Sequence, residues 1–221
     1  THHLMFAKDA NNTLWTTSGG GGGVVGWLNT KVWDETHDAA KSQGWTALVL
    51  DTNGNGKRDD YTEGEQNVAA APSGESFGTA AIMNAKIDPK KDTRMNAAFY
   101  GIGIAPDGAV WGSVLGFPGG IVRLNPGSNP PETALAEFYE VPYNNPKAKV
   151  QGFSPRGMDV DGNGVAWVAL GSGHLASFDR RKCKVFNGPK ATGQQCPEGW
   201  TLYPVPGPKF KGSSFSAAFF Y

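Results

Sequence analysis

The sequence predicts an all-β protein, a β-propeller fragment with about three four-stranded blades and one long insertion. Composition is the first observation behind this prediction: the 221 residues include 31 Gly and 15 Pro, and aromatic residues make up 11% of the chain. Disordered chains contain few aromatic residues, so this composition favours a folded protein with many turns. The second observation is a threefold internal repeat, and the third is the turn chemistry within each repeat.

Three segments share one pattern of strands and turns. They begin at His3 (HLMFAKDANNTLWTTSGGGGGVVGWLNT), at Gly101 (GIGIAPDGAVWGSVLGFPGGIVRLNP) and at Gly157 (GMDVDGNGVAWVALGSGHLASFDR). Each has a short strand, a turn of Asp, Asn and Gly that suits a tight hairpin, and a second strand with a Trp near its start. A glycine-containing turn, a third strand and a more distant fourth strand complete the unit. Four antiparallel strands per unit are typical of propeller blades.

The repeat divides the chain into units. These are blade one at 1–52, an insertion at 53–98, blade two at 99–150, and blade three with the start of a further strand at 151–221, all in one propeller domain. The fourth strand of blade one is predicted at 45–52. The aligned Trp15, Trp111 and Trp167 are predicted to pack between neighbouring blades.

The number of units predicts partners. Three blades cannot close a ring, because propellers have roughly four to eight. We therefore expect the chain to be part of a longer protein, with the remaining propeller blades, or another chain completing the ring, as its partners.

The second unit resembles the repeat of streptogramin B (virginiamycin B) lyases and their NHL-like propeller relatives. The shared residues are G-I, P-D-G-x-x-W, G-x-I-x-R and P within 101–126, and the other two units match more loosely. For this family the resemblance implies a magnesium-assisted elimination that opens a cyclic depsipeptide ester, with a His base and a metal held by carboxylates. The His residues at the start of a unit are His2 and His3, whereas Tyr100 and Arg156 stand at the positions equivalent to His2, with no acidic residue in register. The resemblance therefore implies the scaffold, and the family's catalytic residues are not carried over.

The unit starts contain the candidate ligand-binding residues. The first strand of a propeller blade runs along the central channel, and adjacent strand residues point to opposite faces, so one of His2 and His3 faces the channel. Together with Tyr100 and Arg156 they predict a ring of polar groups at one channel mouth, suited to an anionic or hydrogen-bonding ligand. The alternative is that all four are ordinary polar residues of a rim.

The stretch LDTNGNGKRDDYTEG (50–64) contains the candidate metal ligands. Its spacing D-x-N-x-N-G-x-x-D runs over Asp51, Asn53, Asn55 and Asp59, and the backbone carbonyl of Lys57 stands at the seventh position. Calcium-binding loops supply oxygen ligands at these positions, with a glycine at the sixth. Position twelve is Thr62, and Glu63 falls one residue late. The stretch is either a structural calcium site or an Asn-Gly-rich turn.

Cys183 and Cys196 flank the polar, turn-rich segment KVFNGPKATGQQ. They form either a disulfide, which implies an oxidising compartment and hence a periplasmic or extracellular protein, or a pair of free thiols. The net charge of +0 gives no electrostatic reason to expect nucleic acid or an anionic membrane as a partner. We also find no apolar run long enough for a membrane span.

Three other runs have ordinary structural interpretations. GGGGG (19–23) is interpreted as a hairpin connection, DVDGNG (159–164) as a hairpin turn and DRRKCK (179–184) as a solvated rim. The first function hypothesis is a calcium-stabilised propeller module of a secreted or periplasmic bacterial protein that binds a ligand or a protein partner. The alternative is a lyase-like enzyme at the channel mouth, with magnesium as its metal.

Overall fold

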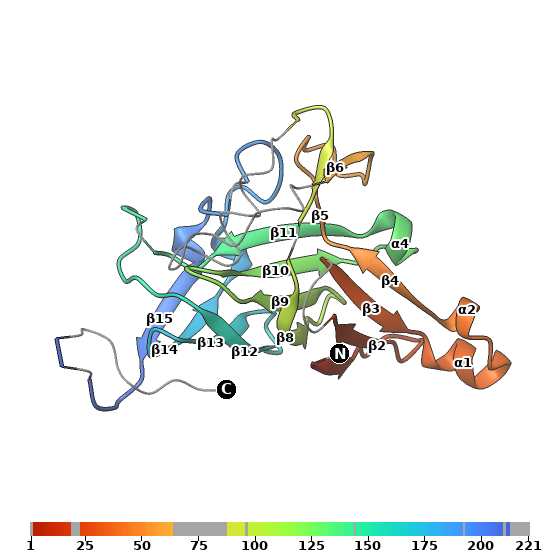
Figure 1. The fold of residues 1–221 in the computed structure, drawn as a ribbon, viewed down its shortest axis with the longest axis horizontal. Helices are drawn as coiled ribbons and strands as arrows, with labels where there is room; N and C mark the ends of the chain where they lie inside the picture. The colour runs from red at the N-terminus through yellow and green to blue at the C-terminus, as the bar shows by residue number, and fades with distance from the viewer. Residues whose placement is uncertain are drawn as a thin grey trace.

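The computed structural model describes residues 2–18, 23–63, 88–95, 97–143, 145–191, 193–209 and 211–212. These residues form mostly antiparallel β-sheet, which confirms the predicted all-β class (Figure 1). Most of the predicted insertion and of the GGGGG run, and the last residues of the chain (213–221), lie outside the described residues.

The first sheet is a four-stranded antiparallel meander in the order β1-β2-β3-β4. Its strands are β1 (Leu4–Phe6), β2 (Leu14–Thr17), β3 (Val24–Leu28) and β4 (Gln43–Ala47). Two short helices, α1 (Thr30–Thr36) and α2 (Ala39–Ser42), connect β3 to β4. Side chains cap both, because Asn29 accepts the amide of Val32 and Asp38 accepts that of Ala40.

The second sheet contains seven strands in the order β6-β7-β5-β11-β10-β9-β8. Its regular half is a meander of β8 (Phe99–Ile104), β9 (Val110–Val114), β10 (Gly120–Asn125) and β11 (Leu135–Glu140). A short helix, α4 (Pro130–Thr133), precedes β11. Beyond β11 lie β5 (Val49–Leu50), β7 (Asp92–Arg94) and β6 (Tyr61–Glu63), which extend the sheet on the side away from β8.

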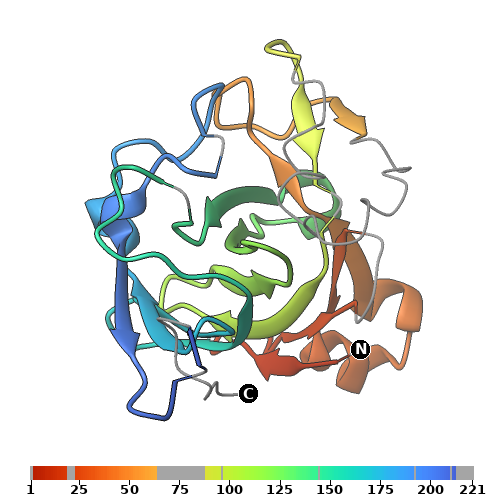
Figure 2. The same cartoon turned by 60° about the vertical axis from the view of Figure 1, so that its left-hand side comes forward.

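The third sheet is again a four-stranded antiparallel meander, in the order β12-β13-β14-β15. Its strands are β12 (Pro155–Val160), β13 (Ala166–Leu170), β14 (His174–Phe178) and β15 (Trp200–Pro204). Two 3-10 turns, Arg180–Lys182 and Pro197–Gly199, lie between β14 and β15. In Figure 2 the second sheet stands between the first (red to orange) and the third (blue).

The strand predicted at 45–52 is divided between two sheets. β4 ends at Ala47 in the first sheet, and β5 pairs with β11 and β7 of the second. Leu48 and Val49 are fully buried at the crossing, and Leu48 belongs to the core between these two sheets. The apolar run ALVL is continuous because its residues belong first to the first sheet and then to the second.

Two hydrophobic cores separate the three sheets. Trp15 lies in the core between the first and second sheets, and Trp111 in the core between the second and third, where it packs near Tyr139 and Phe178. Both tryptophans are buried, at 3% and 1% exposed, as predicted for a ring packed between neighbouring sheets.

Cys183 and Cys196 form a disulfide, which confirms the first of the two alternatives. The disulfide closes the loop 183–196. This loop covers the part of the β11 edge that does not pair with β5. Glu140 donates its amide to the carbonyl oxygen of Gly193, and the Gln195 side chain donates to the carbonyl oxygen of Phe138. The disulfide therefore holds a loop that protects a sheet edge from pairing with another chain.

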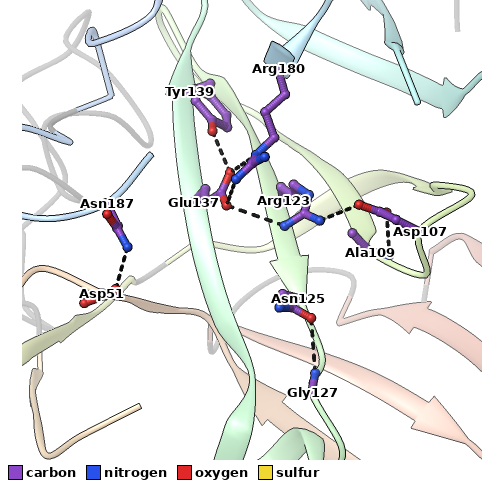
Figure 3. A network of polar contacts seen from close by, with 10 residues as sticks. All are labelled: Asp51, Asp107, Ala109, Arg123, Asn125, Gly127, Glu137, Tyr139, Arg180 and Asn187. Carbon is purple, nitrogen blue, oxygen red and sulfur yellow. Dashed lines mark hydrogen bonds and ion pairs between the residues drawn. The ribbon is translucent and has the colours of Figure 1, made fainter. Parts of the chain in front are cut away.

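An ion-pair network joins this part of the third sheet to the second. Figure 3 shows Glu137 of β11 at its centre, where it accepts two hydrogen bonds from Arg180, at 2.6 and 2.7 Å, and one from Tyr139. Arg123 of β10 bridges Glu137 and Asp107. The run 179–184 was predicted to be a solvated rim, but Arg180 is only partly exposed because it pairs with Glu137.

Strands β8 and β12 approach each other unusually closely. A Cβ atom on Gly101 would lie 2.8 Å from the Met158 amide nitrogen, and one on Gly103 would lie 3.0 Å from the Asp159 Cα. The hydroxyl of Ser113 on β9 completes this contact, because it accepts the amide of Gly101 at 2.8 Å and donates to the carbonyl oxygen of Arg156 at 2.5 Å. One buried side chain thus joins three strands of two sheets.

We expect Ser113→Ala to lower the free energy of unfolding by about 1–3 kcal/mol, because it leaves the Gly101 amide and the Arg156 carbonyl without their shared partner. Urea denaturation followed by Trp fluorescence measures this. The matched control is Ser128→Ala at an exposed loop position. Equal losses in the two variants would contradict the bridging role of Ser113.

Candidate functional site

The inner strands of the three sheets have equivalent registers. Trp15, Trp111 and Trp167 on the second strand of each unit pair with Met5, Gly103 and Asp159 on the first. His3, Gly101 and Gly157 stand two residues before these partners, as the sequence repeat predicts. A break in register follows Phe99 in β8 and Pro155 in β12, so Tyr100 and Arg156 lie in the same irregularity of their strands.

The same type of contact holds the start of the inner strand in two units. In the first unit the hydroxyl of Thr17 accepts the amides of His2 and His3, at 3.1 and 3.0 Å. In the second unit the hydroxyl of Ser113 accepts the amide of Gly101. A hydroxyl on the second strand thus orients the backbone at the start of the first strand.

The structure brings His2, His3, Tyr100 and Arg156 together, as the register predicts. The ring centroids of His2 and His3 are 4.4 Å apart, and that of Tyr100 lies 4.6 Å from His2 and 5.2 Å from His3. The Cζ atom of Arg156 lies 5.9 Å from the centroid of the Tyr100 ring. These residues lie at the start of the inner strands of three different sheets, or just before it, and we call them the polar cluster.

Hydrogen bonds orient the two imidazoles. The Nδ1 atom of His3 donates to the carbonyl oxygen of Tyr100 at 2.5 Å, and it lies 2.7 Å from Nδ1 of His2. Because a carbonyl oxygen only accepts, this contact places a proton on Nδ1 of His3 and leaves Nε2 as its basic nitrogen.

Arg156 has an unused hydrogen-bond donor. Its Nε atom is shielded from solvent and has no hydrogen-bond partner among the residues that the structure describes. A shielded donor without a partner costs free energy, and such groups are rare in folded proteins.

A groove of about 570 Å³ begins beside the polar cluster and runs over the inner strands. His3, Gly101 and Gly157 line it. Asp159 and Trp167 line it as well, although neither was predicted to be a site residue. Strand alternation places Asp159 on the same side of β12 as Gly157, and this signal could have identified it.

Trp167 differs from its two equivalents. It is half-buried, stacks on Tyr203 of β15 with the ring centroids 5.9 Å apart, and donates its Nε1–H to Asp161 at 3.0 Å. Asp161 lies in the run DVDGNG, where it accepts the amides of Asn163 and Val165, so this run is the hairpin turn that the sequence predicts. The described residues form two hydrophobic cores, and neither of them encloses the ring of Trp167. This ring therefore faces the groove.

An aromatic cluster lies at the same end of the second sheet as Tyr100. The ring of Phe117 lies 4.6 Å from that of Tyr143 and 5.1 Å from that of Phe153. Phe117 follows the end of β9, and the end of β9 pairs with the start of β8. Nothing in the local sequence predicts this cluster, since its members come from two connections, Phe117 from that between β9 and β10, and Tyr143 and Phe153 from that between β11 and β12.

The predicted metal ligands lie in the loop between β5 and β6, at the end of the second sheet opposite to β8 (Figure 1). The groove lies at the β8 end of this sheet. Asp51 accepts the amides of Gly54, Asn55 and Gly56 through its side chain. The side-chain amides of Asn53 and Asn55 donate to Asp59, at 3.0 and 2.5 Å. These hydrogen bonds turn the predicted ligands toward one another within the loop.

No three His, Cys, Asp or Glu side chains in the described part of the chain are close enough together to hold a metal ion. Three of the five predicted calcium ligands are neutral oxygens, from the side-chain amides of Asn53 and Asn55 and the backbone carbonyl of Lys57. Calcium accepts such neutral oxygens together with carboxylates.

The fold and the groove define a class: a predominantly β protein built from antiparallel four-stranded meanders, with a polar cluster where their inner strands begin. No protein-family model, curated protein or solved structure matches the chain. Among the described residues, no helix has the length and apolar character needed to cross a membrane.

Proposed function

We propose that the chain is part of a β-propeller that binds a small anionic or hydrogen-bonding ligand, or a partner that presents such a group, at the polar cluster. The observation that carries this proposal is the convergence of His2, His3, Tyr100 and Arg156 from three sheets beside one groove. The guanidinium of Arg156 supports an anionic acceptor as the bound group, because it is a cation with several N–H donors. Asp159 and Trp167 give the groove a carboxylate and an aromatic face for the rest of the ligand.

Arg156→Gln tests this proposal. Citrate and inorganic phosphate serve as probes, and calorimetry measures their binding to the chain. Hydrogen bonds to charged groups contribute about 1.5–3 kcal/mol, so we expect the variant to lose at least about tenfold in affinity for the probe that binds. The matched control is Arg181→Gln, since Arg181 is exposed and pairs with Asp179. The proposal is wrong if neither probe binds, or if both variants bind as the unmodified chain does.

A lyase-like enzyme with magnesium is the second candidate. One observation favours it: the hydrogen bond from His3 to Tyr100 leaves Nε2 of a groove-lining imidazole as a base. Asp159 is a carboxylate on the same groove that would help to hold the metal, which would polarise the ester and stabilise the carboxylate that leaves in the elimination.

Under this second candidate, His3→Ala abolishes ring opening of a cyclic depsipeptide in the presence of magnesium, because it removes the base. Mass spectrometry of the product measures turnover. Thermal unfolding of the variant serves as the control for stability. Absence of turnover by the unmodified chain, or full turnover by His3→Ala, excludes this candidate.

We propose further sheets of the same kind as the partners of this chain. The outward face of the first sheet exposes Leu4 (58%), Phe6 (48%) and Trp45 (53%). On the third sheet, the face that carries Trp167 exposes Tyr203 (46%). The equivalent faces that carry Trp15 and Trp111 are each covered by the next sheet. Propeller closure would cover the two open faces in the same way.

The double variant Phe6→Ser and Trp45→Gln tests the open face of the first sheet. We expect it to reduce self-association and binding of the dye ANS by the isolated chain, because it removes apolar surface that a further sheet would cover. Sedimentation velocity and dye fluorescence measure both effects. Val150→Ser, at an exposed position outside that face, is the control. If the double variant and the control self-associate and bind the dye to the same extent, this face has no docking role.

We also propose that the loop 51–59 binds calcium and that the protein is secreted or periplasmic. The hydrogen bonds that orient Asp51, Asn53, Asn55 and Asp59 support the first. The disulfide supports the second, because disulfides persist in oxidising compartments. The calcium loop lies at the end of the second sheet opposite to the groove, so its role would be structural.

A further inference from the structure

Four Asn-Gly sequences occur in the chain, and they begin at Asn53, Asn55, Asn163 and Asn187. Asn-Gly is the sequence most prone to deamidation, because glycine has no side chain to hinder attack of its amide nitrogen on the side-chain carbonyl carbon of the asparagine. All four lie within the described residues, and their hydrogen bonds differ. The structure therefore distinguishes asparagines that sequence alone makes equivalent.

Asp51 holds the glycine amides of three of these sequences. Its carboxylate accepts the N–H of Gly54 at 2.7 Å and that of Gly56 at 2.9 Å. Its carbonyl oxygen accepts the N–H of Gly188, which is buried, at 2.7 Å. The attacking nitrogen must first lose its proton, and a hydrogen bond from that N–H, above all to an anion, opposes the loss. Asp51 thus disfavours attack by all three glycines.

Carboxylates also hold the side chains of the same three asparagines. The side-chain amides of Asn53 and Asn55 donate to Asp59, at 3.0 and 2.5 Å. That of Asn187 donates to Asp51 at 2.7 Å, a contact drawn in Figure 3. These hydrogen bonds fix the orientation of each side chain, and each must break before the side-chain nitrogen can leave as ammonia. Both reacting groups are therefore held in these three sequences.

Asn163 lies in a different environment, the hairpin turn between β12 and β13. It is exposed, and its side chain makes no hydrogen bond within the described ranges. The amide of Gly164 donates to the backbone carbonyl oxygen of Asp161 at 2.9 Å, which is a neutral acceptor. Neutral hydrogen bonds are weaker than those to a carboxylate, so this amide is the least strongly held by charge.

We propose that Asn163 is a site of spontaneous deamidation in the folded protein, and that Asp51 and Asp59 protect the other three asparagines. The amide nitrogen of Gly164 gives its proton to base in the solvent and bonds to Cγ of Asn163, whose bond to Nδ2 breaks as ammonia leaves. Water then opens the resulting succinimide. The product is aspartate, or isoaspartate, in which the backbone runs through the former side chain. Neither the proposed ligand nor calcium takes part in this reaction.

The turn that contains Asn163 also positions a residue of the groove. Asp161 accepts the amides of Asn163 and Val165 through one carboxylate oxygen and the Nε1–H of Trp167 through the other. A new carboxylate at position 163, or a longer backbone there, would disturb these hydrogen bonds. Because Trp167 lines the groove, deamidation would alter the aromatic side of the groove.

Peptide mapping by mass spectrometry tests the proposal. The chain is incubated in mildly alkaline buffer, and the rate of deamidation is measured at each of the four asparagines. We expect Asn163 to react at least about tenfold faster than each of the others, because a hydrogen bond to a charged group contributes that much. The control is the chain unfolded in guanidinium chloride, where the four rates should become similar. Similar rates in the folded chain, or the same preference for Asn163 in the unfolded chain, would overturn the proposal.

Asp59→Ala tests the protecting role of a carboxylate directly. Asp59 is exposed, so its replacement leaves the core intact. We expect deamidation at Asn53 and Asn55 to become about three- to tenfold faster, since their side chains lose an acceptor, while the rate at Asn163 stays unchanged. Asp34→Ala, at an exposed position of α1, is the matched control and should change none of the rates. Circular dichroism verifies that both variants fold, and unchanged rates at Asn53 and Asn55 in folded Asp59→Ala would overturn protection by Asp59.

Discussion

The contact between β8 and β12 is the constraint on which the remaining structure depends. Gly101 and Gly103 allow the two backbones to meet, and the Ser113 hydroxyl joins them through hydrogen bonds. This contact sets the second and third sheets face to face, so that Trp111 is enclosed between them. It also fixes the starts of the two strands, and the guanidinium of Arg156 consequently lies beside the ring of Tyr100.

The two sides of the second sheet have different roles. On the inner side, β8 contributes to the groove, and its approach to β12 leaves little room for large side chains. On the outer side, β11 is held by β5, by the disulfide loop and by the Glu137–Arg180 ion pair. A bidentate, partly buried pair of this type is more favourable than an exposed one, because geometry and reduced solvent screening strengthen it. The outer contacts thus stabilise the sheet that carries the inner site.

The polar cluster could be predicted from the sequence, because the internal repeat alone places its members in equivalent positions. Once the three tryptophans are aligned, His2, Tyr100 and Arg156 occupy one register, and strands with the same register place equivalent residues together. The same alignment treated Trp167 as equivalent to Trp15 and Trp111, yet Trp167 faces the groove. The difference arises because burial depends on which sheet covers a face, and a repeat pattern does not contain that information.

The sequence by itself determined the all-β class, the hairpin turns and the registers of the inner strands, and it left a disulfide or two free thiols as alternatives for Cys183 and Cys196. The first three follow from local patterns, namely alternation and Asp-Gly and Asn-Gly turns. Only the tertiary structure decided that Leu50 pairs with Ala136, that Arg180 pairs with Glu137 and that Asp92 reaches the loop of Asp51. Each of these contacts joins segments far apart in the chain. Their formation depends on how whole sheets pack, which no local pattern encodes.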